Sequence, residues 1–122
     1  MIAPFRAARA AAWALGARRA AQRQIADIGK RGLPLPRAPR LGLQHTRWVS
    51  RVLWHTDATC LVRSAVLQRW YADHGREYDL VIGVTAPSKG FRAHAWLDTP
   101  EPDPQAAEFT EMTRLAAQDV AG

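Results

Sequence analysis

The residue with the most distinctive chemistry in this 122-residue sequence is Cys60, which is its only cysteine. Thr59 precedes it and is a good helix N-cap, because its hydroxyl can accept from an unpaired amide of the first turn. The sequence therefore predicts a helix that begins at Cys60, with the thiol near the positive end of the helix dipole. This position favours a thiolate nucleophile. The alternative is a structural role, in which Cys60 is a small, buried and inert side chain.

A thiolate nucleophile needs a nearby base, and His94 is the candidate. Residues 91–98 alternate in polarity, which predicts a strand whose apolar face carries Phe91, Ala93, Ala95 and Leu97. His94 then lies on the opposite face, beside Trp96. An imidazole that acts as a base also needs an acceptor that fixes its tautomer. Distance along the chain is no obstacle, because such partners meet in the fold.

The elements that must position Cys60 and His94 can be read from the surrounding pattern. Apolar residues at helical spacing follow Cys60, and Gly75 suits the left-handed position after the helix end. Residues 43–54 predict a second helix, residues 78–84 a buried strand and residues 108–112 a third strand. The expected fold is α+β, with helices packed on a small antiparallel sheet. The apolar stripe consists of Val62, Val66, Leu67 and Trp70.

The N-terminal part is basic and differs in composition. Residues 5–28 predict a helix rich in alanine and arginine, and the glycines and prolines of residues 29–42 predict an extended linker. A transit peptide, or a basic helix on a partner or an anionic membrane, would also fit this helix. We favour a domain helix whose basic face docks a partner. The expected organisation is residues 1–42 followed by a core at 43–122, in one compact domain.

Charge and cysteine count narrow the class of protein. The net charge is +6, and residues 1–54 hold 11 Lys and Arg against one acid, Asp27. The basicity therefore belongs to one segment rather than to the surroundings of Cys60. A single cysteine allows no internal disulfide and suits a reducing cytoplasm. No run approaches the roughly 18 apolar residues that a membrane span needs.

Three blocks of the sequence resemble the lasso-peptide maturation proteases, and in particular their small stand-alone leader peptidases. The blocks are CLVRS at residues 60–64, LVIGV at 80–84 and FRAHAW at 91–96, in the order and spacing of that family. The resemblance covers residues 60–98 and extends loosely to 110. It implies a transglutaminase-like, papain-related core in which Cys60 is the nucleophile and His94 the base.

The sequence departs from that family after His94. The family continues through a glycine-containing turn to an aspartate that orients the histidine, whereas this connection is shorter and rich in proline. Asp103, nine residues after His94, is the expected orienting residue. Asp98 and Glu101 are the alternatives.

The resemblance implies a cysteine peptidase that removes the leader from a lasso-peptide precursor, without a metal or an organic cofactor. The implied partners are the precursor peptide, a separate leader-recognition protein and a lasso cyclase. Nucleic acid is not expected as a partner, and membrane association is possible but not predicted. Two other functions fit the residues: an acyl or amine transferase on the same core, and a non-catalytic module that binds through its basic helices.

Overall fold

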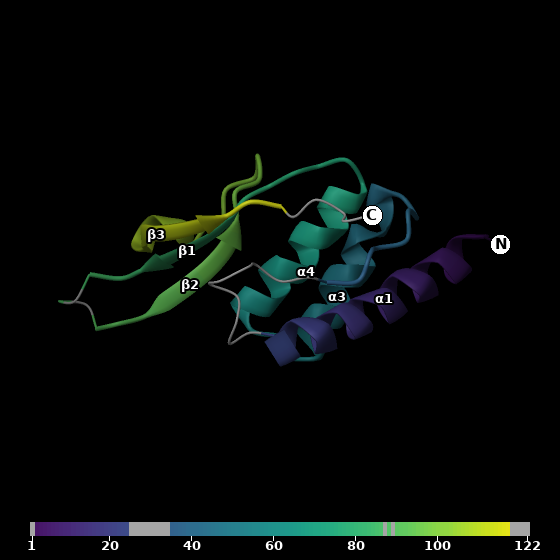
Figure 1. The fold of residues 1–122 in the computed structure, drawn as a ribbon, viewed down its shortest axis with the longest axis horizontal. Coiled ribbons are helices and arrows are strands. Elements are labelled where there is room, and N and C mark those ends of the chain that lie inside the picture. Colours follow the sequence, from purple (N-terminus) through teal and green to yellow (C-terminus); the bar gives the residue numbers. More distant parts are fainter. Residues whose placement is uncertain (1, 25–34, 87, 89, 118–122) are drawn as a thin grey trace.

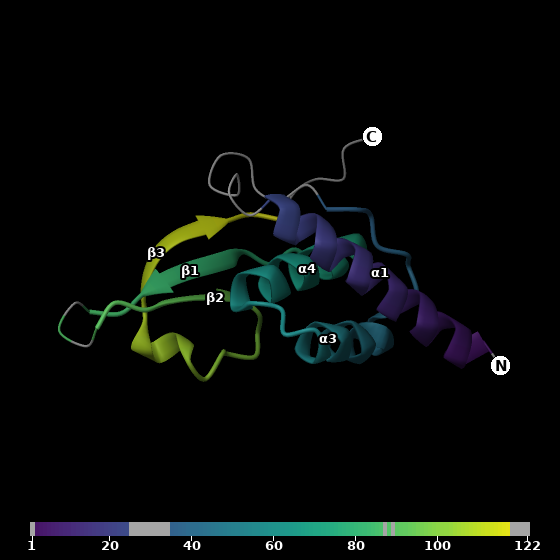
Figure 2. The same cartoon turned by 90° about the horizontal axis from the view of Figure 1, so that it is seen from below.

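The computed structural model describes residues 2–24, 35–86, 88 and 90–117. In these residues, helices α1, α3 and α4 accompany an antiparallel sheet of strands β1, β2 and β3, which confirms the α+β class. Helix α4 lies at the centre, with the sheet on one side and α1 and α3 on the other (Figures 1 and 2). The bounds are α1 Ile2–Gln24, α3 Thr46–His55, α4 Cys60–Asp73, β1 Leu80–Val84, β2 Ala93–Leu97 and β3 Thr110–Leu115, with short 3-10 helices at Leu43–His45 and Ala106–Glu108.

Helix α1 is an integral part of the core. Its buried face consists mainly of alanines, whose small side chains let α3 and α4 approach its backbone closely. Trp13 provides the large anchor, because its ring packs against the fully buried Trp70 of α4 at 5.6 Å between centroids. The helix was expected to run to residue 28, but residues 25–28 lie outside the described part. The buried alanines are Ala10, Ala14, Ala17, Ala20 and Ala21.

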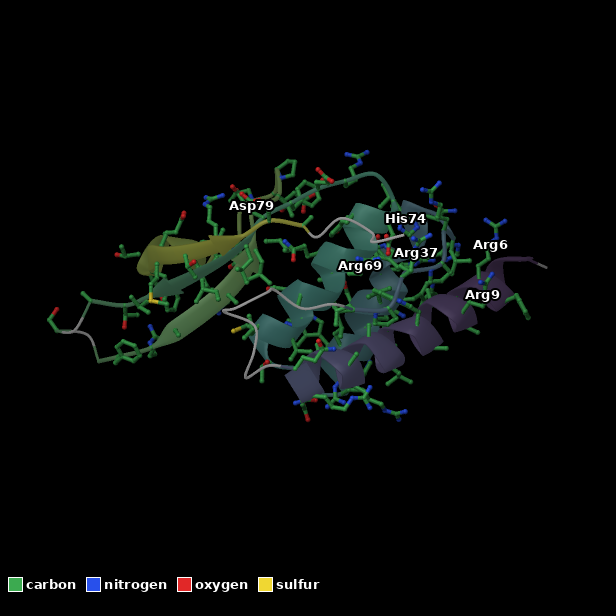
Figure 3. All side chains as sticks on the ribbon, in the orientation of Figure 1. Arg6, Arg9, Arg37, Arg69, His74 and Asp79 are labelled. Carbon is green, nitrogen blue, oxygen red and sulfur yellow. The ribbon has the colours of Figure 1, made fainter. Side chains whose placement is uncertain are left out.

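Residues 35–42, which we call the strap, pack across the C-terminal end of α4. Their buried side chains are Leu35, Ala38 and Leu41, so this half of the expected linker belongs to the core. The Ala38 amide donates to the Asp73 carboxylate at 2.7 Å, and the Gly42 amide donates to His74 Nε2 at 3.2 Å. Figure 3 shows Arg37 of the strap beside Arg69 and His74. The remainder of the expected linker, residues 29–34, lies outside the described part.

Helix α4 begins at Cys60, as the sequence predicts. The Thr59 hydroxyl accepts from the Val62 amide at 3.2 Å and so satisfies one of the free donors of the first turn. The predicted apolar stripe faces the core, with Leu67 partly buried and the other three side chains fully buried. The helix ends at Asp73, and Gly75 follows with a positive φ of 81°.

The sheet has the order β2-β1-β3, so β2 is an edge strand. Gly83 of β1 lies opposite His94 of β2, and Ala95 packs into the core. Phe91 was expected on the apolar face with Ala95, but it precedes the start of β2 and is 80% exposed. Ala93, the first residue of β2, is also exposed, so the expected apolar face meets the core at Ala95 and Leu97.

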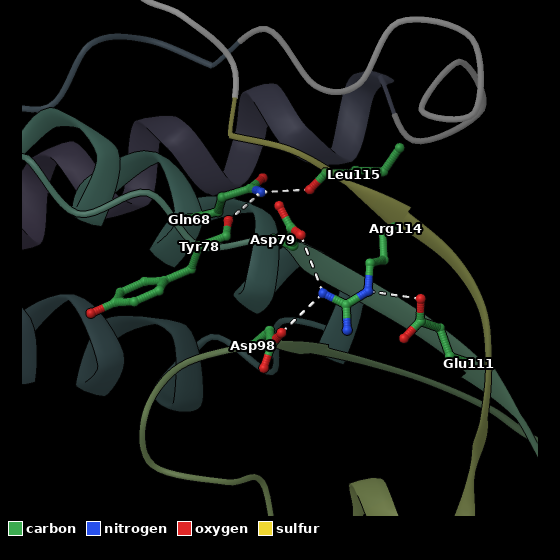
Figure 4. Close-up of polar contacts among 7 residues, drawn as sticks. All are labelled: Gln68, Tyr78, Asp79, Asp98, Glu111, Arg114 and Leu115. Atoms are coloured by element: carbon green, nitrogen blue, oxygen red, sulfur yellow. Dashed lines mark hydrogen bonds and ion pairs between the residues drawn. The ribbon is translucent and has the colours of Figure 1, made fainter.

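One arginine ties the sheet to its flanking loops. Arg114 of β3 bonds the carboxylates of Asp79, Asp98 and Glu111, at 3.2, 2.9 and 2.7 Å respectively (Figure 4). These three partners raise the pKa of the guanidinium above its usual range. Gln68 of α4 also donates to the backbone oxygens of Tyr78 and Leu115, which joins the helix to the sheet.

Among the described helices, none combines the length and the apolar character that crossing a bilayer requires. The proposed boundary at residue 42 stays a prediction, since α1, the strap and α4 share one hydrophobic cluster.

Candidate active site

Cys60 occupies the first position of α4, partly buried and packed against the hydrophobic core. Its backbone amide belongs to the first helical turn, where amides have no carbonyl partner one turn earlier. Cys60 is a free thiol, with no disulfide partner among the described residues. The position at the helix start is as the sequence predicts.

His94 is paired with Asp103. The His94 Nε2 atom lies 3.0 Å from Asp103 Oδ2, and the two side chains are only 11% and 26% exposed. An ionised carboxylate can only accept, so His94 donates the proton on Nε2 to it. In the neutral ring this leaves the lone pair on Nδ1, which is the nitrogen that can take a proton from a nucleophile.

The carboxylate of Asp103 is itself held in place. Its second oxygen, Oδ1, accepts from the Gln105 amide at 2.8 Å, and its backbone oxygen accepts from the Ala106 amide at 3.1 Å. These bonds form a local turn just before the 3-10 helix Ala106–Glu108. The proline-rich connection after β2 thus presents a fixed acceptor to His94, nine residues before Asp103 in the sequence.

Aromatic rings enclose the imidazole. Trp96 stacks with His94 at 5.6 Å between centroids and 22° between planes, and Phe109 lies 5.2 Å away. The Trp96 ring and the Cβ of Phe109 lie against Gly83, where an added Cβ would meet Trp96 at 2.9 Å, the Thr110 carbonyl at 2.9 Å and Phe109 Cβ at 3.0 Å. A residue without a side chain at position 83 is therefore what lets these rings close on His94.

Asp98 and Glu101, the two alternatives to Asp103, have other neighbours. Asp98 directs its carboxylate to Arg114 at 2.9 Å, outside hydrogen-bond reach of His94 in the described contacts. Glu101 lines a pocket near Tyr71, and its charge contributes to a raised pKa of the Tyr71 hydroxyl. Burial is the largest cause of that increase, followed by the neighbouring Tyr78. Of the three candidates, Asp103 is the one that bonds to His94.

A pocket of about 550 Å³ lies between α4, the free edge of β2 and residues 99–105. Helix α4 contributes Arg63 and Ser64, which follow Cys60 by three and four residues and so lie on its side of the helix. Arg63 donates to the Ala58 carbonyl at 2.7 Å and lies over the Trp54 ring. The lining residues are Trp54, Arg63, Ser64, Leu67, Tyr71, His94, Ala95, Trp96, Leu97, Thr99, Glu101, Asp103, Pro104 and Gln105.

The structure brings His94, Asp103 and the pocket together, but it does not join Cys60 to them by a hydrogen bond. Cys60 is absent from the lining residues and packs against the hydrophobic core, one helical turn from Ser64. Sequence reasoning missed the pocket residues Trp54, Ser64 and Tyr71. Only Ser64 carried a signal, because its helical spacing of four from Cys60 predicts the same face of α4.

Among the described residues, no group of three or more His, Cys, Asp or Glu side chains could hold a metal ion. The site offers an oriented imidazole that lines a pocket with the proline-rich connection, and a thiol at the start of the helix that borders the same pocket.

The model of the transglutaminase-like superfamily matches residues 1–114, so the chain belongs to that superfamily. This superfamily generally contains enzymes with a Cys-His-Asp set and is related to cysteine proteases and transferases. No curated protein and no solved structure matches the chain significantly.

Proposed function

We propose that the protein is a cysteine peptidase that removes the leader from a lasso-peptide precursor, with Cys60 as nucleophile, His94 as base and Asp103 as orienting residue. The observation that carries the proposal is the His94–Asp103 hydrogen bond of 3.0 Å, which leaves Nδ1 of the imidazole available beside a pocket. Membership of a superfamily of Cys-His-Asp enzymes supports these roles. The three sequence blocks that contain Cys60 and His94 support the choice of substrate.

In the proposed reaction, His94 Nδ1 takes the thiol proton and Cys60 Sγ attacks the scissile carbonyl. The backbone amide of Cys60, free at the helix start, donates to the oxygen that becomes negatively charged. His94 then gives its proton to the leaving amine as the C–N bond breaks and a thioester forms. Water attacks the thioester and passes a proton to His94, which returns it to the Cys60 thiolate as the S–C bond breaks and the acid is released.

This sequence of steps requires Cys60 and His94 to approach within hydrogen-bond distance when substrate is bound. Catalytic hydrogen bonds are often long in unliganded enzymes and shorten in the complex. His94 belongs to an edge strand of the sheet, and Cys60 belongs to the first turn of α4. A substrate backbone that occupies the pocket would lie against both elements.

The proposed partners are the precursor peptide, a separate leader-recognition protein and a cyclase that receives the released core peptide, and the proposed compartment is the cytoplasm. The division between leader recognition and cleavage is carried over from the family that the three sequence blocks resemble. No role for nucleic acid is proposed.

The direct test is mass spectrometry of a mixture of precursor, leader-recognition protein and this chain. We expect one cleavage between leader and core with the wild type, and none with Cys60→Ala or His94→Ala. Cleavage by Cys60→Ala at the wild-type rate would remove Cys60 from the mechanism. If the folded wild type does not cleave the precursor, the assignment as a peptidase is wrong.

The second candidate is acyl transfer, which the relation of the superfamily to transferases favours. A transferase would pass the same thioester to an amine instead of water, so its product would depend on an added amine. A non-catalytic binding module is the third possibility, and its binding would survive Cys60→Ala.

A further inference from the structure

A second concave surface lies far from the candidate active site. Helix α1 and the strap border a shallow, open groove of about 520 Å³, which we call the Arg9–Arg37 groove. Helix α4 begins at Cys60 and ends at Asp73 beside the strap, so the groove and the thiol are about 20 Å apart. Its lining residues are Arg9, Ala12 and Trp13 of α1 and Arg37, Ala38 and Pro39 of the strap.

The floor of this groove is apolar and fixed. Trp13 donates its indole proton to the Pro36 carbonyl at 3.2 Å and packs on Trp70, so it cannot swing out. Phe5 precedes Arg9 by one helical turn and is 69% exposed, which adds an apolar side chain without cover near the rim. An apolar floor beside an exposed phenylalanine suits the apolar side chains of a polypeptide.

The walls of the groove are positively charged. Arg9 and Arg37 are both exposed, and Figure 3 shows them on α1 and on the strap, with Arg6 near Arg9. In residues 2–24 and 35–56, the structure describes nine arginines and neither an aspartate nor a glutamate. Two guanidinium groups that border a narrow apolar floor match carboxylates spaced along one extended or helical segment.

An adjoining hollow of about 320 Å³ is lined by one acid, Asp73. The negative charge of Asp73 does not repel an anionic ligand, for the following reason. Asp73 is buried, pairs with Arg69 at 3.0 Å and accepts from the Ala38 amide, so its charge is compensated locally. Arg37 and Arg40 also line this hollow and extend the positive surface beyond the groove.

We propose that the Arg9–Arg37 groove docks an acidic segment of a partner protein that also carries an apolar side chain. A bilayer would find little apolar area to bury here, because Phe5 is exposed whereas Trp13 is held by its bond to Pro36 and its packing on Trp70. Single-stranded nucleic acid prefers exposed rings on which bases stack, whereas Trp13 is already packed. An acidic, partly apolar polypeptide would pair its carboxylates with Arg9 and Arg37 and place its apolar side chain on the groove floor.

The test is fluorescence anisotropy of the full chain with a labelled synthetic peptide of glutamate and leucine residues spaced by serine. The variant Arg9→Gln with Arg37→Gln removes two charges from the groove. The matched control, Arg19→Gln with Arg23→Gln, removes two exposed charges of α1 that do not line it. We expect binding about tenfold weaker in the first variant and changed less than about threefold in the control.

Equal weakening by both variants would overturn the proposal, because it would show attraction by net charge alone. The absence of peptide binding by the wild type would also overturn it. So would an oligonucleotide or phosphatidylserine vesicles that bind more tightly than the peptide and lose that binding in the groove variant.

Hydrogen exchange on the wild type gives an independent readout if the groove variant folds poorly. Peptide-dependent protection is expected in residues 5–13 and 36–40, and protection confined to any other segment would contradict the proposal. The proposal does not depend on the peptidase function. Cys60→Ala is expected to bind the same peptide normally, so failure of either proposal can be recognised separately.

Discussion

At the scale of single residues, the proposed chemistry depends on which nitrogen of His94 carries the proton. The bond to Asp103 places that proton on Nε2, and the Gln105 amide fixes the carboxylate from the other side. When the acceptor is removed, the imidazole is still present, but nothing fixes its tautomer and orientation.

We predict that Asp103→Ala lowers kcat/KM about 100-fold in the leader-cleavage assay. Asp103→Asn should retain more activity, because the amide oxygen can still accept from Nε2. Asp98→Ala and Glu101→Ala are the matched controls, since neither acid bonds to His94, and each should stay within about threefold of the wild type. A larger loss in either control than in Asp103→Ala would assign the orienting role to that acid instead.

The Tyr71 hydroxyl gives a prediction on pH and stability. Burial raises its pKa above the ordinary 10.0, so the folded protein keeps a proton that the unfolded chain has lost. The stability that Tyr71 contributes is therefore complete below about pH 10 and is lost as the pH rises above that value. Chemical denaturation followed from about pH 9 to 11 should show a steeper loss in the wild type than in Tyr71→Phe. Parallel curves for the two proteins would contradict this assignment.

At the scale of elements, the sheet positions His94 through the close packing of neighbouring residues on Gly83 of β1. Gly83 faces His94 across the β1–β2 pair, and Trp96 and Phe109 close over it. The Trp96 ring can move, but the Thr110 carbonyl belongs to the paired strand and cannot move without disturbing the ladder.

Gly83→Ala should therefore lower both stability and activity. We expect a loss of about 1–3 kcal/mol in the free energy of unfolding from overpacking. Gly16→Ala is the control, because it lies in α1 with nothing within 4 Å of an added Cβ, and it should be neutral or slightly stabilising. Thermal unfolding measures both variants, and a Gly83→Ala protein as stable and active as the wild type would show that this approach is not needed.

The sequence predicts local elements better than the contacts between them. The start of α4 could be predicted because Thr59 and the apolar stripe are local signals. Asp103 could be proposed but not separated from Asp98 and Glu101, since the choice depends on how a proline-rich connection turns in space. The cover of Trp96 and Phe109 over Gly83 depends on strand register, and the packing of the strap depends on contacts between residues far apart in sequence.

At the scale of the whole molecule, the basic N-terminal segment is structural as well as charged. The alanines of α1 and the strap side chains share one cluster with α3 and α4. The elements that carry Cys60 and His94 therefore pack in one molecule with residues that composition alone would assign to an appendage.

We predict that the fragment 43–122 does not unfold cooperatively, because it would expose the buried faces of α3 and α4 that α1 covers. Circular dichroism during heating, with the full chain as control, checks this. A sigmoidal transition of the fragment close to that of the full chain would establish residues 43–122 as an independent domain.

The central claim is that Cys60 is a nucleophile served by His94, and covalent labelling tests it most directly. The full chain is incubated with a peptidyl vinyl sulfone, to which a reactive thiolate adds through an S–C bond, and the intact mass and modified residue are determined. The account predicts one adduct, on Cys60, with no labelling of Cys60→Ala, slow labelling of His94→Ala and normal labelling of Ser64→Ala. An adduct on Ser64, or labelling of His94→Ala at the wild-type rate, would contradict it.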